Sequence, residues 1–214
     1  MKNIFKIIFI LLFAYNLVSC NDKPRPQLFI DQKTKDYVVF QAGSWWSYEE
    51  KSTFLLDTIS IYLNESSMKY WEDFASEEFE QISLYLKWSS GSIVSPGDRS
   101  RFIRISADVN SKKNVGICEE QYPWFLFPNI VFIPFDKIDE NQWVWQNDTI
   151  KYEMFFDSIT VKGKTYYDVM EISGSLPVHH KKPKRIWWAK NIGRIKWENF
   201  GGEVWELTNY HVIQ

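Results

Sequence analysis

The sequence predicts a mainly β fold: a single curved antiparallel sheet, or a half-open barrel, made of consecutive hairpins with few short helices. Three observations favour this class. Apolar and polar residues alternate along several segments, as they do in strands with one buried face. Turn-forming pairs such as Lys162-Gly163 and Gly201-Gly202 separate these segments. Aromatic residues make up 18% of the 214 residues, and aromatic side chains favour strands.

The first element is a short apolar segment behind two lysines. Lys2 and Lys6 precede residues 7–18, an apolar run that only Asn16 interrupts. The run is shorter than the roughly 20 apolar residues of a membrane-spanning helix, and it is typical of a secretory signal peptide. An ordinary signal peptide and a membrane anchor are the alternatives to a lipoprotein signal peptide.

Leu17-Val18-Ser19 directly before Cys20 resembles a bacterial lipobox. The resemblance implies that residues 1–19 are removed and that Cys20 is acylated, with palmitate among the attached chains. The protein would then be anchored through this lipid to a bacterial membrane, more often the outer one, and would face the periplasm or the cell surface. Acylation of Cys20 leaves Cys118 as the only thiol, which its apolar neighbours predict to be buried and inert.

Residues 20–35 are expected to form a tether and residues 36–214 a single β-rich domain, because Pro24 and Pro26 disfavour regular structure at the start. The strands are predicted from alternation over residues 57–63, 81–88, 101–109 and 150–156. A hairpin is predicted around Lys162-Gly163, and a three-stranded meander over residues 185–207. Helix signals are weak; the best segment, residues 69–79, leaves both a helix and a non-helical structure open. Residues 121–129 indicate an irregular, aromatic crossover.

The C-terminal residues 186–210 also carry a resemblance. The block from Ile186 to Glu198, followed by Trp205-Glu-Leu-Thr-Asn-Tyr210, is similar to the ending of uncharacterised lipoproteins common in Bacteroidota. The segment that begins at Gly43, Gly-Ser-Trp-Trp-Ser-Tyr, resembles the same group. The resemblance implies an exported, β-rich domain. Some of these domains are similar in outline to curved-sheet carriers of the outer membrane, a likeness of fold that carries no function.

No enzyme motif is found in the sequence. Glycine-rich nucleotide loops, zinc-binding histidine pairs, Cys-x-x-Cys and nucleophile elbows are all missing, so no catalytic residue, metal site or cofactor is predicted. His179 and His180 are adjacent and would point to opposite faces of a strand, and His211 is expected in the last strand. A near-neutral net charge of −2 argues against a nucleic-acid partner.

Aromatic side chains are the first candidates for ligand contact. Trp143 and Trp145 share one face of a predicted strand, whereas Trp187 and Trp188 would face opposite sides. Such rings could stack on a sugar or line a groove for an acyl chain; the alternative is that they fill a strongly curved sheet. The basic segment 179–185 could contact anionic headgroups, with a solvated loop as the alternative.

Three Asp-Ser/Thr-Ile tripeptides are similar to the O-glycosylation acceptor of exported Bacteroidota proteins. They place candidate hydroxyls at Thr58, Thr149 and Ser158. Strand entry is the alternative interpretation, since Asp favours turns and β-branched residues favour strands.

Together these observations predict an exported, membrane-anchored lipoprotein that acts as a non-catalytic binding or scaffolding module for a glycan, a lipid or an envelope protein. A carrier of lipid or another hydrophobic ligand is one alternative. A glycan or cell-wall hydrolase is the least favoured. The state of the concave face distinguishes them: filled, open and apolar, or open with paired carboxylates.

Overall fold

Strands account for most of the chain. The computed structural model describes residues 25–70, 77–89, 100–108, 113–121, 142–145, 148–174 and 183–214. These residues form twelve strands and one helix: β1 (Gln27–Leu28), α2 (Gln32–Val38), β2 (Trp45–Glu50), β3 (Leu56–Lys69), β4 (Glu78–Trp88), β5 (Ser100–Asp108), β6 (Lys113–Gln121), β7 (Gln142–Trp145), β8 (Asp148–Val161), β9 (Lys164–Gly174), β10 (Pro183–Ala189), β11 (Gly193–Asn199) and β12 (Val204–His211).

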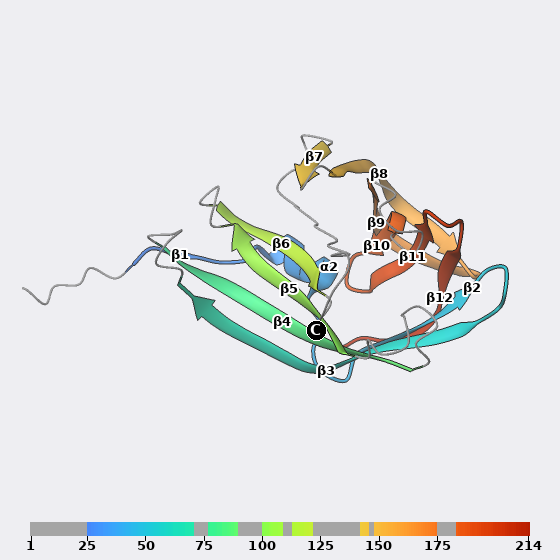
Figure 1. Cartoon of the computed structure of the whole chain (residues 1–214), viewed down its shortest axis with the longest axis horizontal. Helices are drawn as coiled ribbons and strands as arrows, with labels where there is room; N and C mark the ends of the chain where they lie inside the picture. The colour runs from blue at the N-terminus through green and yellow to red at the C-terminus, as the bar shows by residue number, and fades with distance from the viewer. Residues whose placement is uncertain are drawn as a thin grey trace, which may run out of the picture.

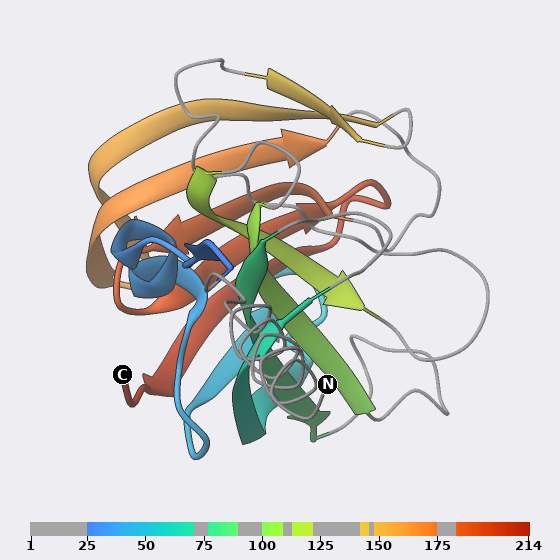
Figure 2. The same ribbon diagram turned by 90° about the vertical axis from the view of Figure 1, so that its left-hand side faces the viewer.

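All twelve strands belong to one sheet, which confirms the predicted fold class. Its order is β6-β5-β4-β3-β2-β12-β11-β10-β9-β8-β7, with β1 added beside β4. Two antiparallel meanders, β2 to β6 and β7 to β12, are therefore joined by the pairing of the first strand of one with the last strand of the other. The sheet curves strongly, with the greens of one meander facing the oranges of the other (Figures 1 and 2). In the described chain β6 and β7 are unpaired edges, so the barrel is not closed.

Alternation in the central strands defines two faces. In β2, Trp46 and Tyr48 are buried while Ser47 and Glu49 are only partly covered. β12 continues the pattern with buried Trp205 and Leu207, and β11 with buried Trp197. We call the face with these buried side chains the core face. It holds the hydrophobic core because every second residue of these central strands points there.

β-bulges strengthen the curvature of the sheet. The register shifts between Ile61 and Leu63 in β3, between Leu207 and Asn209 in β12, and between Trp187 and Trp188 where β10 pairs with β11. An extra residue in one strand of a pair bends that strand and increases its twist. The bulges thus turn a long sheet into an open curve around its core face.

Regular structure starts before residue 36, where the sequence predicts the boundary between tether and domain. β1 pairs in parallel with the start of β4, and Leu28 and Ile30 are buried in the core. Asp31 then caps α2 by accepting a hydrogen bond from the backbone N–H of Thr34. This cap, an Asp directly before a short helical run, is the local signal that the two preceding prolines obscured.

The remaining differences between prediction and structure concern individual segments and leave the fold class unchanged. No helix is described over residues 69–79, where β3 ends at Lys69 and β4 begins at Glu78; residues 71–76 lie outside the described chain. β2 and β6 were not among the predicted strands. The predicted hairpin around Lys162-Gly163 and the C-terminal meander are both present, as β8–β9 and β10–β12.

Candidate ligand-binding pocket

A cavity of about 50 Å³ lies on the core face, between the end of α2 and the central strands. Its described lining residues are apolar or aromatic except for Arg194. They come from six strands, from the end of α2 and from the segment that follows α2: Val38, Phe40, Trp46, Tyr48, Ile59, Ile61, Leu84, Leu86, Ile103, Trp188, Gly193 and Arg194. Strands that are distant in sequence meet here because the sheet curves around this point (Figure 2).

Two aromatic side chains of β2 fix one wall of this pocket. The indole N–H of Trp46 donates to the carbonyl of Ile192 over 2.6 Å, and the hydroxyl of Tyr48 donates to the carbonyl of Arg194 over 2.8 Å. Both bonds reach past β12, the first to the turn between β10 and β11 and the second to β11 itself. Aromatic rings whose polar ends are hydrogen-bonded and whose faces are packed have little freedom to move. This wall is therefore preformed.

Gly193 is required in another wall. Its φ is +92°, a conformation that L side chains rarely adopt. A Cβ at this position would stand 3.2 Å from Cε2 of Phe40, which itself contacts Trp46 edge-on at 5.1 Å. The backbone of β11 thus approaches the Phe40 ring as closely as only glycine allows.

Polar groups in the lining are few and specific. The guanidinium of Arg194 lies over the rings of Trp188 and Trp197, at 5.2 and 5.4 Å from their centroids. The indole N–H of Trp188 is buried, at 4% residue exposure, and has no acceptor among the described residues. A buried donor without a partner costs about 1–3 kcal/mol. Trp188 is thus a lining residue whose buried indole N–H, like that of Trp205, has no acceptor among the described residues.

The size of the cavity limits what enters it. An engineered protein cavity of about 150 Å³ accepts benzene, and this one is about a third as large. Most of the core face is filled by large rings, including the stacked pair Trp197 and Trp205 at 5.8 Å and the edge contact of Tyr48 with Trp197 at 4.7 Å. The pocket as it stands suits the end of an apolar chain or a small apolar group, and not a whole lipid.

The opposite face of the sheet carries a row of charged and aromatic side chains. Strand register places Glu171, Trp187, Lys196, Glu206 and Glu49 directly beside one another across β9, β10, β11, β12 and β2. The Trp187 indole donates to the carboxylate of Glu171 over 2.9 Å, and Lys196 pairs with Glu206 over 3.2 Å. Cross-strand pairs of this kind stabilise a sheet.

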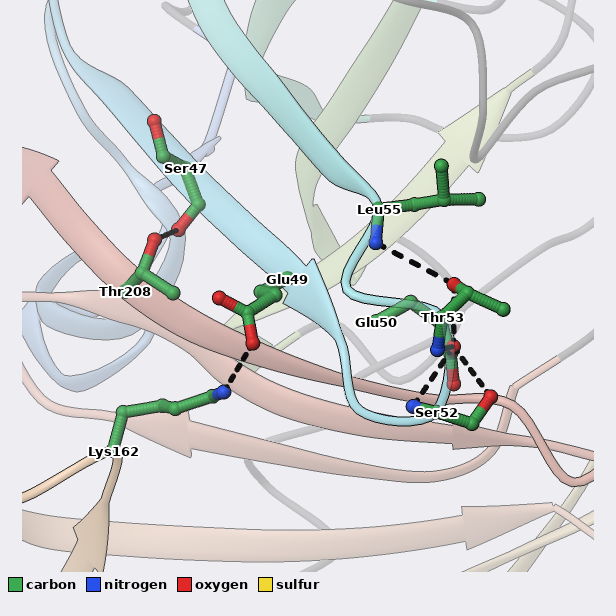
Figure 3. A network of polar contacts seen from close by, with 8 residues as sticks. All are labelled: Ser47, Glu49, Glu50, Ser52, Thr53, Leu55, Lys162 and Thr208. Atoms are coloured by element: carbon green, nitrogen blue, oxygen red, sulfur yellow. Dashed lines mark hydrogen bonds and ion pairs between the residues drawn. The ribbon is translucent and has the colours of Figure 1, made fainter.

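Carboxylates are thus brought together, but away from the cavity. Glu206 and Glu49 are directly opposite each other, and each has its own lysine: Glu206 pairs with Lys196, and Glu49 pairs with Lys162 (Figure 3). The described lining of the pocket contains no carboxylate. Among the described residues no group of three or more histidine, cysteine, aspartate or glutamate side chains is placed to hold a metal ion. Hence the part of the chain that the structure describes offers no acid–base pair beside the pocket.

Glu50 is the ionisable group whose environment changes it most among the described carboxylates. Burial opposes its ionisation, but hydrogen bonds from the hydroxyls of Ser52 and Thr53 and from the backbone of Thr53 and Val204 outweigh it and lower the pKa of Glu50 to about 2. The four donor atoms of Ser52 and Thr53 lie 2.6–3.0 Å from one carboxylate oxygen (Figure 3). Its contacts are all within the β2–β3 hairpin and to β12, so its role is to hold that turn.

The tryptophans singled out from the sequence have different fates. Trp187 and Trp188 face opposite sides as predicted: Trp188 lines the pocket and Trp187 belongs to the charged row. Trp143 and Trp145 both belong to β7, at an edge of the sheet, and their side chains lie outside the described part of the structure. Trp46 and Tyr48 build one wall of the pocket, but the sequence predicts no ligand contact for them; they belong only to the segment from Gly43 that carries the resemblance.

The other candidates are scattered. Cys20, His179 and His180 lie outside the described residues, and so does the side chain of Cys118 in β6. His211 ends β12, as expected. Two cations of the basic segment belong to β10 and pair with acids: Lys184 with Glu198 over 3.2 Å, and Arg185 with Glu171 over 3.7 Å. They are therefore part of the sheet surface and not of a free loop.

The three candidate acceptor hydroxyls also differ. Ser158 is exposed in the middle of β8, opposite Tyr167. Thr58 is partly buried and its hydroxyl lies 2.8 Å from that of Ser47, while its preceding Asp57 is buried. Thr149 is in β8, and its side chain lies outside the description. Of the described hydroxyls, that of Ser158 is the more accessible to a glycan.

Comparisons with known proteins identify no relative: no family model, no curated protein and no solved structure matches the chain. Within its described residues, no helix combines the length and the apolar character needed to cross a membrane.

Proposed function

We propose that the protein is an exported lipoprotein, anchored through Cys20, whose curved sheet is a non-catalytic binding module. Its ligand site is the cavity between α2 and the core face. The single observation that carries this proposal is the apolar cavity itself, whose lining includes Trp188, a residue with a buried indole N–H that has no acceptor among the described residues. Buried donors are usually paired, and the indole N–H of Trp205 and the hydroxyl of Tyr166 also lack a partner in the described chain; a ligand that brings an acceptor to Trp188 would remove the cost there.

The ligand chemistry follows from the lining. A small apolar group or chain end would contact the side chains of Ile59, Ile61 and Leu84, and an attached oxygen would accept a hydrogen bond from the Trp188 indole N–H. Arg194 is the one charged residue of the described lining, and its positive charge favours an anionic or carbonyl oxygen over a cation. The end of an acyl chain with its carboxylate or ester nearby has this chemistry.

A hydrophobic-ligand carrier is the second candidate, favoured by the apolar character of the cavity. It requires the cavity to widen several-fold, because a preformed drug-sized site is about 300–1,000 Å³. A hydrolase is supported least, since the described carboxylates Glu49 and Glu206 are paired with lysines on the opposite face.

Calorimetric titration with octanoate tests the proposed site, with octylammonium as a probe of equal chain length that carries no acceptor. We expect octanoate to bind and octylammonium not to bind. Trp188→Phe keeps an aromatic ring but removes the N–H, and it should weaken octanoate binding about fivefold or more, as expected for one lost hydrogen bond of ~1 kcal/mol. Trp187→Phe is the matched control on the opposite face and should leave the affinity unchanged. Absence of octanoate binding, or equal losses in both variants, would contradict the proposal.

A further inference from the structure

The tip of the β2–β3 hairpin exposes three consecutive large apolar side chains. Phe54 is 71% exposed, Leu55 50% and Leu56 61%. The hairpin projects beyond the neighbouring strands at one end of the long axis of the molecule (Figure 1). We call residues 51–56 the hairpin tip. Single exposed apolar residues are common on protein surfaces, but a contiguous group of them marks an interaction site.

The fold holds this tip in one conformation. The carboxylate of Glu50 accepts from the backbone N–H groups and hydroxyls of Ser52 and Thr53. Two backbone bonds of 2.9 Å close the turn, from Phe54 N to Glu50 O and from Glu50 N to Leu55 O. Figure 3 shows Leu55 pointing away from this network. The apolar side chains are thus displayed from a rigid base, which lowers the entropy cost of a contact.

The backbone of Phe54 is strained, and the side chain is exposed. Its φ is +59°, a left-handed conformation that is uncommon for bulky residues and costs about 1–3 kcal/mol. The strain places a large ring where it is 71% exposed, so it is not offset by burial within the described chain. Strain at an exposed apolar residue is the pattern of a functional position and not of a core.

The charge of the tip is favourable for an anionic surface. Lys51 is exposed, and the tip itself contains no acidic residue. The carboxylates that flank it, Glu50 and Asp57, are buried at 3% and 1% exposure. The tip therefore presents one cation beside three apolar side chains, and a lysine near an anionic membrane contributes about 1 kcal/mol.

We propose that the hairpin tip inserts into the interface of a phospholipid bilayer. Consecutive residues in a tight turn point in different directions, so a single protein groove would cover only some of them, whereas the acyl region of a bilayer accepts all three. The proposed lipid anchor at Cys20 also favours a membrane contact by the domain, because a single lipid anchor needs a second membrane contact for stable binding. Insertion of the tip does not depend on that anchor, and it is tested without it.

The position of the tip also sets an orientation. β3 runs for 14 residues from Leu56 at the tip to Lys69, which pairs with Phe79 beside β1. Tip and chain entry are therefore separated by roughly 45 Å, the length of such a strand. A lipid near the entry and an inserted tip at the far end would lay the long axis of the domain along the membrane.

Flotation with vesicles tests the insertion. The chain from residue 21 onward lacks the lipid and keeps every residue that the structure describes. It is mixed with vesicles of phosphatidylethanolamine and phosphatidylglycerol. We expect the wild type to float with the vesicles and Phe54→Ser/Leu55→Ser/Leu56→Ser to lose at least about tenfold in partition. Met154→Ser/Tyr167→Ser, which removes two other exposed apolar side chains, should float like the wild type, and Phe54→Leu/Leu55→Ile should retain binding.

Each other outcome overturns the proposal. A wild type that does not float, or a tip variant that floats equally, excludes insertion of the tip. Equal losses in the tip variant and in the Met154/Tyr167 control would assign binding to general hydrophobicity. If sedimentation shows a dimer that the tip variant alone abolishes, and no vesicle binding, the tip contacts a second copy instead. Octanoate binding measured on the same variants separates these results from a failure of the proposed ligand site.

Discussion

Replacing Glu50 by Gln should make the protein less stable at neutral pH and remove part of its acid sensitivity. The carboxylate holds the β2–β3 turn through four donor atoms of Ser52 and Thr53 and a backbone contact from Val204. Gln has one acceptor oxygen in place of two, so its amide would face the N–H of Val204 or the donors of the turn. An unsatisfied donor is left in either orientation.

The magnitude follows from the pKa. Hydrogen bonds outweigh the effect of burial and lower the pKa of Glu50 from 4.5 to about 2. At 1.36 kcal/mol per pKa unit, the ionised carboxylate contributes at most about 3 kcal/mol to the free energy of unfolding. The turn residues 51–53 are exposed, so solvent screening reduces this to about 1–2 kcal/mol. For a chain of this size that is a decrease of roughly 2–8 °C in melting temperature.

The sign of the pH dependence is defined because the folded pKa is the lower one. The contribution is complete above pH 4.5 and is lost as the pH falls towards 2. Thermal unfolding followed by circular dichroism should therefore show a gap between wild type and Glu50→Gln at pH 7 that closes between pH 4.5 and 2. Glu49→Gln, which breaks an ion pair with Lys162, is the control and should cost less than about 1 kcal/mol. A Glu50→Gln gap that is absent at pH 7, or constant with pH, would refute the reasoning.

Three further predictions concern single residues. Gly193→Ala should destabilise the protein by about 1–3 kcal/mol in urea unfolding, and by more than Gly202→Ala, because both have positive φ but only the former brings a Cβ to 3.2 Å from Phe40; equal costs would mean that the Phe40 contact is loose. Cys20→Ala should abolish palmitate labelling in the native host, and a mutant that still labels and fractionates with membranes would exclude the lipobox. If Ser158 is glycosylated, the intact mass of the native protein should exceed that of the lipidated chain by hexose-sized steps that Ser158→Ala removes; a mass equal to the lipidated polypeptide would end this hypothesis for all three hydroxyls.

The fold class could be predicted because most of the strands carry a local signal, although β1, β2 and β6 were missed. The alternation of Ile59 and Ile61 and the Lys162-Gly163 turn are local, and a sheet of hairpins follows from such signals directly. β1 and α2 escaped prediction because they are short and are stabilised by tertiary contacts, such as the burial of Leu28 and Tyr37 in the core.

The pocket could not be predicted, because it depends on contacts between strands far apart in the chain. Trp46 and Ile192 are separated by 146 positions, and the pairing of β12 with both β2 and β11 brings them together. Nor does the sequence distinguish Trp188 from Trp187 as the residue that lines a cavity: alternation places them on opposite faces, but does not say which face is the core.

The proposed ligand site is tested most directly by locating where an apolar ligand binds. The protein can be labelled with 5-fluorotryptophan, its ¹⁹F resonances assigned by Trp→Phe variants, and octanoate added. Binding in the pocket should give saturable shifts at Trp46 and Trp188, which line it, and none at Trp187 on the opposite face. Shifts at Trp187 but not at Trp188, or no saturable shift at any tryptophan, would contradict it.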